Sequence, residues 1–134
     1  MIPQTQNLTL TRGDYFEMYF RFRTQVWDSG SGTYVDGPYR DLTGIEWLGQ
    51  IRHAADDTAV LATFTFQIDD QGSPDTLGGV LVFLSGDDAA LLPEAPSASS
   101  TEKHVYDLQM TMDGKPETFV AGKVTVKADV SRPE

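Results

Sequence analysis

The stretch from His104 to Arg132 reads HVYDLQMTMDGKPETFVAGKVTVKADVSR, and it decides the fold class of this chain. Apolar and polar side chains alternate up to Met112, and the alternation resumes at Val120. Between the two runs, Asp113-Gly114 supplies the positive φ angles that a tight turn needs, so the stretch predicts a long β-hairpin. The hairpin carries no catalytic motif, and we therefore expect it to be scaffold and not the wall of an active site.

The rest of the chain repeats this pattern. Alternating runs predict strands, with an apolar face toward the core and a polar face toward solvent. The expected strands are 7–11, 15–23, 45–52, 60–68 and 78–84, and the last is apolar on both sides, as in the middle of a sheet. Ser85 and Asp88 form a capping signal for one short helix near residues 86–92, which Pro93 ends. The fold class predicted is all-β: an immunoglobulin-like β-sandwich or a barrel-like Greek key.

A length of 134 residues predicts a single domain over 1–134. Residues 1–6 are polar and unpatterned, and we expect a flexible N-terminal arm there. Residues 28–40 predict a long loop, because 28–37 is rich in Gly and Ser, and a small strand at 33–35 is an alternative within it. Residues 93–101, rich in Pro, Ala and Ser, predict a linker loop.

Composition excludes several classes of function. With 20 acidic and 10 basic residues, the net charge of −10 argues against a protein that binds nucleic-acid phosphates or an anionic membrane surface. The chain has no cysteine, which excludes disulfides and thiolate metal sites. No apolar run approaches the roughly 20 residues that a membrane-spanning helix requires. The N-terminus also lacks the basic segment and the apolar segment of a secretory signal peptide. We therefore expect synthesis and assembly in a cytoplasm.

The residues that often carry chemistry have no supporting motif. His53 and His104 have no nucleophile or carboxylate at a motif spacing, and we interpret them as partly exposed residues at strand ends. The pair Asp69-Asp70 lacks the spaced ligands of a calcium loop, and Gly78-Gly79 lacks the Lys-Ser or Lys-Thr of a phosphate loop. We expect no catalytic residue, no metal and no cofactor, hence a protein that is not an enzyme.

Aromatic side chains near the predicted loop are the best candidates for a binding role. The candidate contact residues are Trp27, Tyr34, Tyr39, Tyr19 and Arg40. Aromatic residues beside a long loop favour protein contact or sugar stacking, and core packing explains Trp27 equally well. We expect the loop over 28–40 to become ordered against a partner.

Three motifs, in their order along the chain, carry a resemblance to a known class of proteins. They are Asp41-Leu42-Thr43-Gly44, Tyr106-Asp107-Leu108 and Gly122-Lys123-Val124-Thr125-Val126. Together with the strands between them, from about Leu8 to Arg132, they resemble the N-terminal domain of phage baseplate upper proteins and tail-fibre attachment domains.

The resemblance implies a structural protein of a tailed-bacteriophage virion, acting as a tail- or baseplate-associated subunit. Its partners would be other virion proteins, contacted in many copies. Relatives of this kind commonly continue into a rod, whereas this sequence ends at Glu134. That difference suggests a stand-alone component, and a capsid decoration protein is the alternative. A further alternative is a carbohydrate-binding module that stacks cell-wall sugar on Trp27, Tyr34 and Tyr39.

Overall fold

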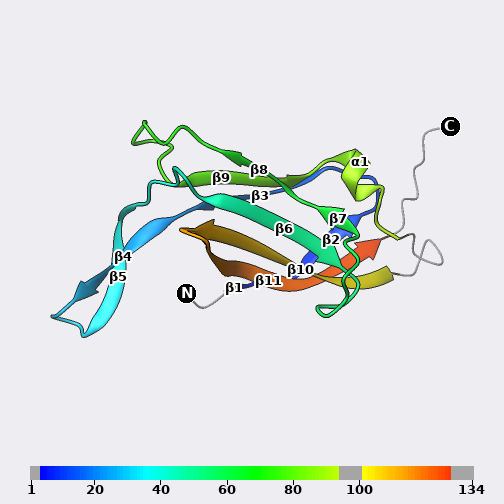
Figure 1. Cartoon of the computed structure of the whole chain (residues 1–134), viewed down its shortest axis with the longest axis horizontal. Coiled ribbons are helices and arrows are strands. Elements are labelled where there is room, and N and C mark those ends of the chain that lie inside the picture. Colours follow the sequence, from blue (N-terminus) through cyan, green and yellow to red (C-terminus); the bar gives the residue numbers. More distant parts are fainter. Residues whose placement is uncertain (1–3, 94–100, 128–134) are drawn as a thin grey trace.

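The computed structural model describes residues 4–93 and 101–127, in which two β-sheets pack face to face and a third, two-stranded sheet extends from them (Figure 1). The strands are β1 (Gln4–Thr5), β2 (Leu8–Thr11), β3 (Phe16–Arg21), β4 (Arg23–Asp28), β5 (Thr33–Tyr39), β6 (Glu46–Arg52), β7 (Ala62–Thr63), β8 (Thr65–Ile68), β9 (Gly79–Leu84), β10 (Thr101–Met112) and β11 (Lys115–Lys127). The described part holds one helix, α1 (Gly86–Ala89). The predicted all-β sandwich with a single short helix is confirmed.

The predicted terminal hairpin is confirmed as β10 and β11, the two longest strands. Asp113 and Gly114 both have positive φ, 51° and 74°, and Met112 pairs with Lys115 across the turn. The pairing shifts by one residue after Leu108, so that Phe119 is an extra residue on β11. The shift turns Phe119 inward beside the buried Val120, and a large aromatic side chain enters the core.

The N-terminal segment belongs to the larger sheet, whose strand order is β1-β11-β10-β6-β7. Both β1 and β2 pair in parallel with β11, Gln4 opposite Val120 and Leu8 opposite Val124. The predicted flexible arm over residues 1–6 is therefore wrong for residues 4–6, because their backbone forms hydrogen bonds with β11. Residues 1–3 lie outside the described residues.

The smaller sheet has the order β3-β9-β8, which confirms that the doubly apolar segment 78–84 lies in the middle of a sheet. Its inner side chains pack against those of the larger sheet and exclude water from the core. Fully buried members of this core are Ile51, Val80, Val82, Leu84, Leu108, Met110, Val120, Val124 and Val126.

The expected single strand over 60–68 is wrong, because it breaks at Phe64. Ala62–Thr63 pairs with β6 in the larger sheet, whereas Thr65–Ile68 pairs with β9 in the smaller one. Phe64 lies at the corner, with its side chain buried and its amide bonded to the carbonyl of Gly49 at 2.8 Å. The chain thus changes sheets at this residue and closes one side of the sandwich.

The helix begins as predicted and is shorter than predicted. The Ser85 hydroxyl accepts a hydrogen bond from the Asp88 amide at 3.1 Å, which caps the first turn. Regular helix covers only Gly86–Ala89, and the following residues make turn contacts up to the buried Leu92. Of the predicted linker loop 93–101, residues 94–100 lie outside the described residues, and Thr101 already begins β10. No helix in the described part is long and apolar enough to cross a membrane.

Candidate functional site

Residues 28–40, predicted as a long loop, instead form most of a β-hairpin. Strands β4 and β5 pair antiparallel, with Trp27 opposite Tyr34. Most of the glycine and serine residues that suggested a loop form its turn, residues 29–32, where Gly32 has a φ of 69°, whereas Gly37 lies within β5. The small strand expected at 33–35 is part of β5. We call residues 23–39 the projecting hairpin, because they extend beyond one end of the sandwich (Figure 1).

Four large apolar side chains near the tip of the projecting hairpin are exposed. Trp27 and Tyr34 keep 56% and 66% of their surface in solvent and pack against each other, with ring centroids 5.2 Å apart. Val26 and Val35, also cross-strand partners, are exposed on the opposite face. Neither face of this ribbon is covered by the sandwich, so these side chains contribute nothing to the core.

The base of the projecting hairpin is fixed to the sandwich. The Phe22 amide donates to the carbonyl of Gly78, and the Arg40 amide donates to the carbonyl of Phe22, both at 2.9 Å. The Phe22 ring packs edge-on against Phe119, at 5.2 Å between centroids, and against Trp47. A rigid aromatic base therefore supports an apolar tip that is free in solution.

The structure does not bring the five predicted contact residues together. Trp27 and Tyr34 share the tip, whereas Tyr39 lies at the base, where the Arg21 guanidinium covers its ring at 3.5 Å. Arg40 donates to the Met112 sulfur, which gives it a structural role.

Tyr19 lies on the outer face of β3 and not on the projecting hairpin. Its hydroxyl donates to Asp69 at 2.6 Å, and this hydrogen bond raises the pKa of the Tyr19 hydroxyl. Only Trp27 and Tyr34 therefore remain as a joint candidate site.

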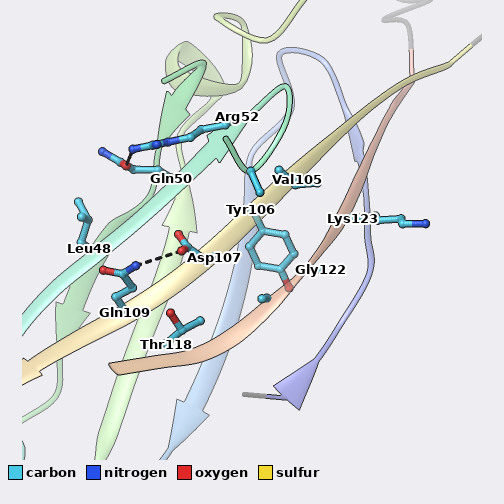
Figure 2. Close-up of a pocket in the computed structure, with 12 residues that line it drawn as sticks. Leu48, Gln50, Arg52, Val105, Tyr106, Asp107, Gln109, Thr118, Gly122 and Lys123 are labelled. Atoms are coloured by element: carbon cyan, nitrogen blue, oxygen red, sulfur yellow. Dashed lines mark hydrogen bonds between the residues drawn. The ribbon is translucent and has the colours of Figure 1, made fainter. Parts of the chain in front are cut away.

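A second surface feature was not predicted from the sequence. The outer face of the larger sheet has a hollow of about 810 Å³ over β6, β10 and β11 (Figure 2). We call it the sheet hollow; its lining includes Leu48, Arg52, Val105, Asp107, Thr118 and Lys123. Ala121, whose side chain is small, and the backbone of Gly122 also line it. Its polar groups bond mainly to one another: the Gln109 amide donates to Asp107 at 3.1 Å, and Arg52 donates to Gln50 at 2.7 Å.

The two histidines, predicted as unrelated and partly exposed, are neighbours. Their Nδ1 atoms are 3.4 Å apart, and His104 is buried although His53 is exposed. The prediction was wrong for His104 because its position on β10 falls on the inner face of the sheet. A hydrogen bond between them requires one ring nitrogen to donate and the other to accept.

Comparisons with known proteins add no assignment. No protein-family model matches the chain, and no curated protein matches it at a significant level. Among the described residues, no group of three or more His, Asp or Glu side chains is arranged to hold a metal ion. The projecting hairpin and the sheet hollow are thus the two surfaces from which a function can be argued.

Proposed function

We propose that this chain is a non-enzymatic structural subunit of a tailed-bacteriophage virion, associated with the tail or baseplate, which assembles through the projecting hairpin. The observation that carries the proposal is the exposure of Trp27 and Tyr34 at its tip. Tryptophan and tyrosine are enriched among the residues that dominate protein–protein binding. A two-stranded β-ribbon is only marginally stable on its own in water. A ribbon with apolar side chains on both faces therefore gains stability when a partner covers it.

The order of motifs along the chain supports the phage part of the proposal. The motif residues shape the scaffold: Leu42 is buried, and the Thr43 hydroxyl and amide donate to Asp41, which lowers the pKa of that carboxyl. Tyr106 and Gly122 hold the N-terminal segment, because the Tyr106 hydroxyl donates to the Gln6 carbonyl, which lies directly over Gly122. The resemblance therefore concerns residues that determine the fold, whereas the projecting hairpin is the partner-facing element of this proposal.

Assembly in many copies suits this arrangement. One hairpin tip offers a small contact area, and its affinity alone is modest. Repetition on a particle raises the effective concentration of neighbouring contacts, so that many weak interactions give stable incorporation. The same reasoning applies to a capsid decoration protein, which stays the alternative location.

The carbohydrate-binding alternative has less support. A sugar-stacking platform needs accessible ring faces, and the ring of Tyr39 is covered by Arg21. The planes of Trp27 and Tyr34 meet at 73°, so that the two rings do not form one flat surface.

Purified particles of the phage or prophage that encodes the chain provide the test. A phage lacking the gene is complemented with wild-type protein, with Trp27→Ser/Tyr34→Ser, or with Leu91→Ser, which removes an equally exposed apolar side chain from another surface. We expect the wild-type and Leu91→Ser proteins to be incorporated into particles. An antibody against the protein should label the tail of these particles. The double variant should be depleted at least about tenfold, since each interface aromatic contributes on the order of 2 kcal/mol. Absence of the wild-type protein from particles would refute the proposal, and equal incorporation of the double variant would refute the role of the hairpin.

A further inference from the structure

We infer that the projecting hairpin of one copy of this chain docks in the sheet hollow of a second copy. This inference rests on the proposed function and names the partner of the hairpin. The two surfaces are different, so the contact is head-to-tail and each copy offers one hairpin and one hollow.

The charges of the two surfaces are complementary. The projecting hairpin carries two acidic residues toward its tip, Asp28 and Asp36, and one cation at its base, Arg23. The lining of the hollow has the opposite balance, with two cations, Arg52 and Lys123, and one acid, Asp107. In a chain of net charge −10, a lining with an excess of positive charge favours an acidic partner segment.

The apolar groups also match. Leu48 is 44% exposed at the side of the hollow, and Val105 contributes a second apolar side chain to it. The hollow, at about 810 Å³, falls in the size range of sites that take compact ligands. Trp27 and Tyr34 are exposed aromatic side chains, and each still has more than half of its surface to remove from water when it docks.

The hairpin of the same copy does not supply this contact. In Figure 1 the projecting hairpin leaves the sandwich at the end where β6 begins and extends away from it. The hollow lies farther along β6, from Leu48 to Arg52, over the middle of β10 and β11. A hairpin seated there therefore comes from another molecule, and repetition of the contact builds a ring or a filament.

Site-directed cross-linking tests the inference directly, because the chain has no cysteine of its own. Thr33→Cys marks the hairpin tip without removing its aromatic side chains, and Thr118→Cys marks the hollow. The matched control is Thr65→Cys, an exposed threonine on β8 of the other sheet. Each single-cysteine protein is first checked for the wild-type circular dichroism spectrum and melting temperature. Pairs are then mixed in a thiol–disulfide buffer at matched concentration.

We expect the mixture of Thr33→Cys and Thr118→Cys to give at least about tenfold more disulfide-linked dimer than the mixture of Thr33→Cys and Thr65→Cys. The excess should fall with added salt and with Lys123→Glu in the hollow partner, since the contact is partly electrostatic. It should also fall when Trp27→Ser and Tyr34→Ser are added to the hairpin partner.

Equal yields from the two mixtures would overturn the inference, and so would a dominant Thr33→Cys homodimer, which indicates a symmetric tip-to-tip contact. If cross-linking fails while the double tip variant is still lost from particles, the hairpin binds a different virion protein. The proposed function then stands and the inference does not.

Discussion

Replacement of Gly122 by alanine should detach the N-terminal segment from the sheet. A methyl group on Gly122 would collide with the backbone carbonyl of Gln6, which crosses directly over it. Three hydrogen bonds depend on this close approach: Gln6 amide to Ala121 carbonyl at 3.0 Å, Lys123 amide to Asn7 Oδ1 at 3.0 Å, and Tyr106 hydroxyl to Gln6 carbonyl at 2.6 Å.

The magnitude follows from these contacts. Each bond contributes about 0.5–1.5 kcal/mol net, so the loss of three costs about 2–4 kcal/mol. The reduced freedom of the unfolded chain on replacing glycine by alanine offsets about 0.4–1 kcal/mol of this. We therefore expect Gly122→Ala to lower the free energy of unfolding by about 1–3 kcal/mol.

Urea unfolding followed by circular dichroism measures this loss, and amide hydrogen exchange of residues 4–8 shows where it arises. Gly30→Ala is the matched control, because a methyl group there would meet only the Asp28 carboxylate at an ordinary 3.4 Å. The reasoning is refuted if Gly122→Ala unfolds within about 0.5 kcal/mol of the wild type while the N-terminal amides keep their protection.

Three further predictions concern the scaffold. Burial raises the pKa of Tyr106 to about 12, so the unfolded chain, with its ordinary value near 10, ionises first. Stability should thus be full below pH 10 and fall by about 2–3 kcal/mol as the pH rises through 12, a dependence that Tyr106→Phe removes in urea titrations. Phe119→Ala should lower the free energy of unfolding by about 3–5 kcal/mol in the same assay, because it removes the ring that packs against Phe20 and Phe22 and leaves a cavity. A loss below about 1 kcal/mol would contradict this packing. Ser85→Ala should cost about 1 kcal/mol through loss of the helix cap, and Ser85→Asp should retain most of the stability.

Alternation predicts strands well where one face is buried against a single sheet, as in β3, β6 and the terminal hairpin. It could not reveal the break at Phe64. The alternation runs unbroken through Ala62, Phe64 and Phe66, because both sheets point their inner faces at one core. A strand that changes sheets there keeps the same side chains inward, and the sequence pattern is unchanged.

The candidate site was predictable only in part. The exposed Trp27 and Tyr34 stood out as aromatic residues near a glycine-rich segment, but β4 and β5 bury neither face, so no alternation marked them as strands. The sheet hollow had no signal in the sequence. Its lining comes mainly from three strands that are far apart in the sequence. Which of their residues become neighbours, such as Gln50 opposite Asp107, depends on the strand register, which the sequence pattern does not reveal.

The parallel pairing of β1 and β2 with β11 has a consequence for how the protein is made. The Lys123 amide bonds to Asn7 across 116 positions of sequence, so β1 and β2 leave the ribosome long before the strand with which they pair. Until translation reaches β11, the nascent chain lacks the edge against which Leu8 and Leu10 are buried. Closure of the sandwich therefore cannot begin before β11 has been synthesised, and ribosome stalling before β11 should leave these leucines available to chaperones.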